Sequence, residues 1–599
     1  MGRIHGKLAP GIRYFVGASL LLACLGLAAW AGALLPPERF SNFGSLSGDP
    51  DGLVPGGDRH NTYAWSMESM KNSAGYEYLY VGSNRDMGYL VLSSNGMSGD
   101  EIMALSGGDL VPPDGGDLRG RIFRKRTDGT GDWEIVYTSE MIPGTPYPFD
   151  MGYRGAVSYA APGEAGPSLY FGSMGFVSTR LLKITPDFEP GGIPETVFQT
   201  EPGTSASLRP MTVYDGDDGD KLYIGVLKAN DDPSLADIQI LESTHPSMDP
   251  GAWKQVAFLS DFPGARTTTA AVASGGVWDM VSFNGWLYAF IGSFYTGADD
   301  DGFLVFKGKP VPEGTYGRNA AGWRWLPVVA MAAGAKYPNG AGNPSNIAPT
   351  PFPYSVDGKD YVYVGTCADL PTAISMVTRG GSVTDFFRAL YPVQVYRFDG
   401  DDNWEMVIGN TQDSGGVFTE RLGNFGAGFF NAPEAVADLP AVFSSPRELS
   451  MNQYAWRAGV YRGKLYVTTM DANVLLDYVK NFASTEEQKA AVELLIEAFR
   501  DYNPNPLGFD LYSTGDGVSF TPVTTNGFGD KYNYGGRTVK ATENGIFIGT
   551  ANPFYGCQVW KLSEEEEEPV VSGGSGGCSA AGATPFALLL ALPLFLLKR

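Results

Sequence analysis

The sequence predicts an all-β fold built from about seven repeats of a unit of four short antiparallel strands. The first observation is a recurring stretch in which bulky apolar and small residues alternate, usually ending at glycine, as in a buried strand. The second is that turns rich in Asp and Gly flank many copies and join neighbouring strands into hairpins. The copies are YLYVGSN (78–84), SLYFGSM (168–174), KLYIGVL (221–227), WLYAFIGS (286–293), YVYVGTC (361–367), KLYVTTM (464–470) and GIFIGTA (545–551).

Each copy has further strands on both sides. A strand and a tight turn come before it, as in WRAGVYRG, and a hairpin follows it, as in VQVYRFDGDDNWEMVIG. Recurring four-strand units of this size are typical of a β-propeller, which we predict for residues 36–562. The seventh unit stops after its third strand at Leu562. We expect a strand from residues 40–65 to complete it and close the ring.

Two motifs resemble known propellers. The repeat is similar to the bacterial G-K-L-Y-V-G-T … V-W-R propellers. GCQVWKL (556–562) matches the second half of this motif in the last copy. STGDGVSF (513–520) resembles the Asp-box turn of sialidase-type propellers. The resemblance implies a bacterial seven-bladed β-propeller.

Composition excludes several kinds of function. The chain has 599 residues and a net charge of -23, and phosphate binding needs clustered Lys and Arg, so we expect no nucleic-acid partner. Four cysteines and three histidines in no metal-ligand spacing predict no metal site, no cofactor and no histidine triad. Whether Cys367 and Cys557 are separate core residues or a disulfide pair stays open.

Residues 1–35 predict export. Arg3, Lys7 and Arg13 precede an apolar run that ends at two prolines, the pattern of a signal peptide. A retained N-terminal membrane anchor and a lipoprotein attached through Cys24 are the alternatives, and all three place the body outside the cytoplasm.

The C-terminal end predicts attachment to the cell envelope. Residues 563–577 form an acidic, Gly/Ser-rich stalk, and residues 578–599 a short apolar tail that ends in Lys598 and Arg599. The tail resembles Synerg-CTERM and GlyGly-CTERM sorting signals, on Gly576, Gly577 and Cys578. This resemblance implies cleavage by a rhomboid-type protease and a cell-surface location. A plain transmembrane anchor is the alternative.

Ligands are expected on one face of the propeller, at the mouth of its axis. Arg154, Arg209, Arg457 and Arg537 each begin the innermost strand of a unit. We predict that they meet residues of the loops after the second strands, namely Asn84, Arg85, Asp86, Asp471, Asn473 and Asn552. Guanidinium groups bind carboxylates and sulfates bidentately, which predicts an anionic glycan or protein ligand. The alternative is that the arginines pair with acids and hold the ring together.

A helical insertion is predicted at residues 475–506. Ser484 and Glu487 form a capping box, and apolar residues from Val492 to Phe499 fall on one helical face. Such a helix either covers the channel or packs on the rim. Acid-rich turns such as DGDDN (399–403) fit no calcium loop and are interpreted as hairpin turns.

Two functions follow. The main prediction is an exported, envelope-attached propeller that binds a ligand or partner without catalysis, since no catalytic motif is present. The alternative is an extracellular hydrolase or lyase acting on anionic glycans, since Arg, Asp, Glu and Tyr suffice in sialidase-type enzymes. Whether the protein is an enzyme is left open.

Overall fold

The computed structural model describes most of the predicted propeller region. Residues 1–563 fall in one compact unit and residues 564–599 in a second, and every described residue belongs to the first. The described residues are 40–45, 58–94, 97–110, 112, 117–202, 207–216, 219–228, 237–265, 277–292, 302–338, 348–367, 393–409, 422–423, 450–481, 485–486, 489–490, 492–494, 496–497 and 507–562.

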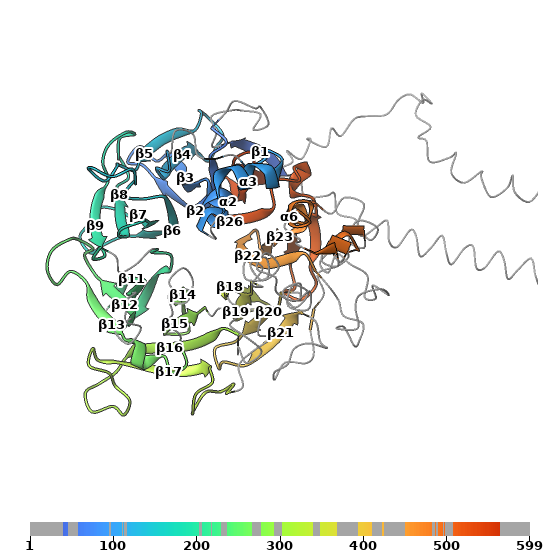
Figure 1. Cartoon of the computed structure of the whole chain (residues 1–599). Helices are drawn as coiled ribbons and strands as arrows, with labels where there is room; N and C mark the ends of the chain where they lie inside the picture. Colours follow the sequence, from blue (N-terminus) through green and yellow to red (C-terminus); the bar gives the residue numbers. More distant parts are fainter. Residues whose placement is uncertain are drawn as a thin grey trace, which may run out of the picture. The chain divides into compact units, whose positions relative to one another are not determined.

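The strands form four-stranded antiparallel units that follow one another along the chain (Figure 1). The first three are β2 (Asn61–Lys71), β3 (Glu77–Arg85), β4 (Arg121–Arg126), β5 (Glu134–Thr138); β6 (Gly152–Tyr159), β7 (Ser168–Met174), β8 (Arg180–Ile184), β9 (Glu195–Gln199); and β10 (Met211–Gly216), β11 (Gly219–Lys228), β12 (Asp237–Ser243), β13 (Lys254–Ala257).

The next three units repeat the arrangement. They are β14 (Val277–Phe283), β15 (Trp286–Ile291), β16 (Leu304–Pro310), β17 (Trp323–Val329); β18 (Thr350–Val356), β19 (Lys359–Gly365), β20 (Val395–Phe398), β21 (Trp404–Ile408); and β22 (Asn452–Tyr461), β23 (Lys464–Asp471), β24 (Leu511–Thr514), β25 (Thr521–Thr524).

The last unit combines both ends of the described chain. It contains β26 (Gly535–Thr542), β27 (Gly545–Ala551) and β28 (Gln558–Leu562), and its outer strand is β1 (Phe40–Ser45). Phe40 pairs with Leu562 and Ser45 with Gln558 in an antiparallel ladder. The predicted closing strand is therefore confirmed.

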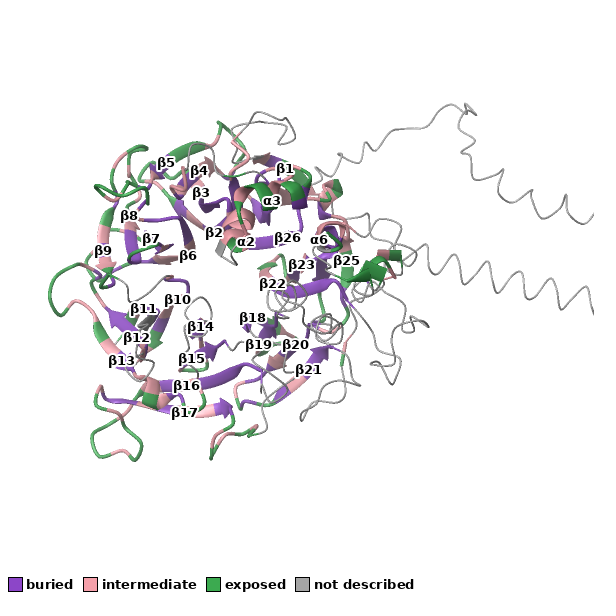
Figure 2. Cartoon of the chain, in the orientation of Figure 1, coloured by how far each residue is buried: buried purple, intermediate pink, exposed green. Residues whose placement is uncertain are grey.

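The innermost strands close a ring. β2 contacts β6, and the series continues through β10, β14, β18, β22 and β26 back to β2. This cycle of contacts is the arrangement of a β-propeller, as predicted. Figure 2 shows that buried residues lie mostly along the strands and exposed ones along the connections. The apolar core lies between neighbouring units, where for example Tyr80 of β3 packs with Phe171 of β7.

Short helices sit on the connections. The second and third strands of the first unit are joined through α2 (Met87–Ser94) and α3 (Gly99–Ser106), which the sequence analysis did not predict. α3 begins at a capping box of Ser98 and Glu101. Two single-turn 3₁₀ helices, η3 (Leu259–Asp261) and η5 (Gly527–Gly529), lie on other connections.

The predicted insertion at 475–506 begins as α6 (Asn473–Val479). Several described residues between 486 and 497 are also helical, and Val492 is buried. The predicted cap residues Ser484 and Glu487, and Phe499, lie outside the described residues.

Three other predictions concern the ends, the cysteines and the acidic turns. In the described part of the chain no helix is long and apolar enough to cross a membrane, and both hydrophobic termini lie outside that part. Cys367 and Cys557 are separate buried thiols. In the 399–403 turn, Asp399 accepts the backbone amides of Asp401 and Asn403, which confirms a hairpin turn there.

Candidate anion-binding site

One register position recurs in the innermost strands. It is a β-bulge, in which one extra residue stands between two ladder pairs and its side chain is re-aimed. In β6 the bulge lies between Tyr153 and Gly155, so that Arg154 is the extra residue. The extra residues at this position are Trp65 in β2, Arg154 in β6, Trp278 in β14, Trp456 in β22 and Arg537 in β26.

Arg209 occupies the matching place in the third unit. The amide of Gly225 donates to the carbonyl oxygen of Pro210 at 3.0 Å, which extends the β10–β11 ladder back to the residue after Arg209. Arg457 and Asp279 each follow the extra residue of their strands. One repeated backbone feature thus presents arginine, tryptophan and one carboxylate from different units.

The indole rings and guanidinium groups of these positions lie against one another. The Arg209 Cζ lies 3.8 Å from the Trp278 ring centroid, and the Arg537 Cζ lies 5.1 Å from that of Trp456. Arg154 lies 5.6 Å from the Trp65 ring and 5.4 Å from the Trp278 ring. Cation–π contacts of this kind stabilise a guanidinium without neutralising its charge.

Among the described residues, one aspartate takes part in the ion pairs of this cluster. Asp279 Oδ2 lies 2.7 Å from Arg457 Nη1 and 3.7 Å from Arg209 Nη2. The Arg154 Nη1 donates to Ser207 Oγ at 3.1 Å. The predicted alternative of acid pairing therefore holds for Arg457 and, at longer range, for Arg209.

Arg537 and Arg209 are buried with unsatisfied donors. Arg537 is 2% exposed, and its Nε and Nη1 have no hydrogen-bond partner among the described residues. The same holds for the Nε, Nη1 and Nη2 of Arg209, which is 7% exposed. Buried charges are normally paired. Arg209 has Asp279 at 3.7 Å, whereas Arg537 has no ion-pair partner among the described residues and needs an explanation.

The charges influence one another. Burial and the neighbouring Arg209 lower the pKa of Arg154 to about 9. Burial, followed by the charges of Arg457, Arg209 and Arg154, holds the pKa of Arg537 well below its usual value. The four predicted arginines are therefore brought together, and the cluster is electrostatically unfavourable without an anion.

Tyrosine hydroxyls border the cluster. The Tyr454 hydroxyl accepts from Trp278 Nε1 at 2.9 Å and lies 3.1 Å from Thr350 Oγ1. Tyr63 and Tyr534 form a very short hydroxyl–hydroxyl contact, and burial raises the pKa of Tyr63 to about 12. Burial also raises the pKa of Tyr534, so the hydroxyls of Tyr63 and Tyr534 stay protonated at neutral pH. An acid and tyrosines therefore lie beside the arginines.

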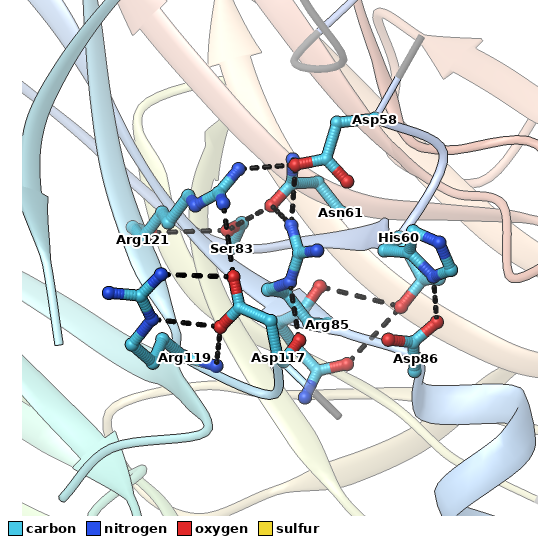
Figure 3. A network of polar contacts seen from close by, with 11 residues as sticks. Asp58, His60, Asn61, Ser83, Arg85, Asp86, Asp117, Arg119 and Arg121 are labelled. Atoms are coloured by element: carbon cyan, nitrogen blue, oxygen red, sulfur yellow. Dashed lines mark hydrogen bonds and ion pairs between the residues drawn. The ribbon is translucent and has the colours of Figure 1, made fainter. Parts of the chain in front are cut away.

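Three of the predicted loop residues, Asn84, Arg85 and Asp86, lie at or just after the end of β3. Asn84 pairs with Gly152, and its Nδ2 donates to the Met151 carbonyl oxygen at 3.3 Å. Figure 3 shows the adjoining network, in which Arg85 Nη1 lies 2.6 Å from Asp58 Oδ2. Asp86 Oδ1 lies 2.6 Å from His60 Nδ1 in the same view.

The other three loop residues have comparable partners. Asp471 Oδ1 accepts the amide of Asn473 at 2.7 Å, and both residues are buried. Asn552 Oδ1 accepts the amides of Phe554 and Tyr555 at 3.2 and 2.9 Å. All six loop residues thus make polar contacts within the protein, since strand ends must satisfy their own backbone groups. That they ring a ligand stays a prediction.

The tryptophan and tyrosine residues of the site were not predicted from the sequence. Trp65, Trp278 and Trp456 share an apolar cluster with Tyr454 and with residues of α3 and α6. The signal was present in the repeat, because YAW recurs at 63–65 and 454–456 with the indole at the bulge. Gly576, Gly577 and Cys578 lie outside the described residues.

No protein-family model and no curated protein matches the chain. Among solved structures it is similar to a GH43 β-xylosidase/α-arabinofuranosidase from a compost microbial metagenome, with 13% identity over 55% of this chain and 89% of that chain and a TM-score of 0.23. It is similar to Pyrococcus horikoshii acylaminoacyl peptidase, with 8% identity over 85% of this chain and 53% of that chain and a TM-score of 0.34. It is also similar to Trypanosoma rangeli sialidase in complex with sialic acid, with 10% identity over 72% and 56% of the two chains and a TM-score of 0.31.

These comparisons correct the prediction of a binding module without catalysis. The similar structures are enzymes, and enzymes that act on glycans recur among them. At such low identities and TM-scores, the similarity indicates neither the substrate nor the mechanism of this chain. Both have to be argued from the residues of the site.

Proposed function

We propose that the protein is an extracellular enzyme that cleaves an anionic glycan at the propeller axis. The observation that carries the proposal is the convergence of four arginines with one paired aspartate, two of the arginines being buried with unsatisfied donors. A group that is costly to bury and has no internal partner suits an external anion.

The surrounding rings favour a sugar as the carrier of that anion. Guanidinium groups bind carboxylates and sulfates through paired N–H donors. Indole rings give flat apolar surfaces, and binding sites combine such surfaces with a few fixed polar groups. Arg154 and Arg457 are half-buried and so offer the accessible donors.

Asp279 and Tyr454 are the groups that we propose for proton transfer. In hydrolysis, water adds to the anomeric carbon as the glycosidic bond breaks, the departing oxygen gains a proton, and the attacking water loses one. In elimination, the proton beside a uronate carboxylate is removed, a carbon–carbon double bond forms, and the departing oxygen is protonated. Arginines that neutralise the carboxylate would make that proton easier to remove.

Glycan cleavage can be tested directly. The protein is incubated with uronate-containing, sulfated and sialylated polysaccharides, and new reducing ends are measured together with the ultraviolet absorbance of unsaturated products. Reducing ends alone indicate hydrolysis, and both signals indicate elimination. Asp279→Asn and Tyr454→Phe should each lower kcat about 100-fold or more with little change in KM. No cleavage of any anionic glycan would refute the proposal.

We also propose that the units described above form a complete ring of seven blades that is exported and held at the cell envelope. The basic and apolar start and the tail from Gly576 to Arg599 support this location. Intact-mass analysis of the protein from its native envelope should show the residues beyond about Cys578 missing, as expected for a tail read by a rhomboid-type protease. A mature protein that keeps Lys598 and Arg599 would favour a plain membrane anchor.

A further inference from the structure

We infer that the group held at the axis carries at least two negative charges close together, as a sulfated uronic acid does, rather than a single carboxylate. The sugar part of this inference rests on the proposed function. The charge part rests only on the side chains of the cluster.

The cluster carries more positive than negative charge, even when Arg154 is not counted. Arg209, Arg457 and Arg537 face one another across the inner strands, and Asp279 is the carboxylate that pairs with two of them. In the described part of the chain no carboxylate forms an ion pair with Arg537. Among the described side chains, three guanidiniums against one carboxylate leave two positive charges to be compensated.

Two of the positive charges of the cluster are buried beside indole rings. Arg537 is buried beside the Trp456 ring, and Arg209 beside the Trp278 ring. Charges surrounded by apolar groups are screened less than charges in water, so an anion bound at the half-buried Arg154 and Arg457 interacts with them without touching them. Arg537 thus acts on the ligand as a positioning charge.

This arrangement gives a quantitative signature. A Coulomb energy is proportional to the ligand's charge, so the loss of one site charge costs a dianion twice the binding free energy that it costs a monoanion. The fold-loss in affinity of the dianion is therefore the square of that of the monoanion. Across several ångströms at an intermediate dielectric, Arg537→Gln is expected to weaken a monoanion about 10-fold and a dianion about 100-fold.

Two matched probes test this. Calorimetric titration at low salt uses an unsulfated chondroitin disaccharide with one carboxylate, its monosulfated counterpart with two charges, and inorganic sulfate as a bare dianion. The wild-type protein should bind the monosulfated disaccharide about 100-fold more tightly than the unsulfated one, and Arg537→Gln should remove about 10-fold of that preference. Arg119→Gln is the control, because Arg119 is only partly buried and pairs with Asp117 at 2.9 Å.

The outcomes separate this inference from the proposed function. Equal binding of both disaccharides, no binding of any probe, or an equal loss for both probes in Arg537→Gln would overturn the inference. Cleavage of anionic glycans without a preference for two charges would keep the proposed function and overturn the inference. A preference for two charges without cleavage would uphold the inference and refute the enzyme.

Discussion

Two buried arginines in different regions of this propeller, Arg180 and Arg537, differ in the presence of an acid. Between the first two units, Arg180 Nη2 lies 2.5 Å from Asp150 Oδ2 and its Nε lies 3.2 Å from Asp150 Oδ1, and both residues are buried. At the axis, Arg537 is as buried but has no such partner among the described residues. A paired buried arginine is part of the framework, whereas one without an acid costs stability and calls for a ligand.

The largest effect should come from breaking the framework pair. Asp150→Ala leaves Arg180 buried and unpaired, and we expect the free energy of unfolding to fall by about 3–5 kcal/mol. Urea denaturation followed by fluorescence measures this loss. The control is Glu134→Ala, which removes the half-exposed partner of Arg124 and should cost less than about 1 kcal/mol. Equal losses would show that burial does not distinguish these pairs.

A buried acid without a cation provides the second test. Burial raises the pKa of Asp510 to about 7, although Asn452 and Tyr512 donate hydrogen bonds to it. The folded state then holds a proton that the unfolded chain releases near pH 4, so stability should fall as pH rises from about 4 to about 7, by a few kcal/mol. Asp510→Asn should flatten that part of the stability–pH curve. An unchanged slope in the variant would contradict this assignment.

In the third test we expect the free energy of unfolding to change in the opposite direction to the first test. Arg537→Gln removes a buried charge that has no ion-pair partner in the described structure, so the free energy of unfolding should stay the same or rise by about 1 kcal/mol. Urea denaturation in a buffer free of multivalent anions measures the change. A loss as large as that in Asp150→Ala would show that Arg537 belongs to the framework.

The strand pattern was sufficient to predict the propeller because alternation of bulky and small residues reports burial directly. The missing fourth strand likewise indicated that residues near Phe40 complete the ring. α2 and α3 were missed although Ser98 and Glu101 spell a capping box, because the segment was interpreted as part of a loop. Local signals of this kind can be found without the fold.

The site was harder to predict because it depends on register. The convergence of Arg154 and Arg537 could be predicted because they occupy equivalent places in the repeat. Trp65 and Trp278, in contrast, resemble ordinary core residues until the bulge is known. The partner of Arg457 could not be predicted either, since Asp279 comes from a unit distant in sequence. Similarly, Asn84 at the end of β3 and Asn552 after β27 stand where ligand-binding residues often do, and only the structure shows the hydrogen bonds that they make within the protein.

The most direct test of the axis site is the affinity of Arg209→Gln/Arg537→Gln for a sulfated uronate oligosaccharide, measured beside its stability. Acting across several ångströms at an intermediate dielectric, each lost charge removes about 1–3 kcal/mol of anion binding. We predict that the double variant folds with unchanged or higher stability and binds at least about 100-fold more weakly than the wild-type protein. A double variant that binds as tightly as the wild type, or that loses stability as Asp150→Ala does, would contradict an anion site at the axis.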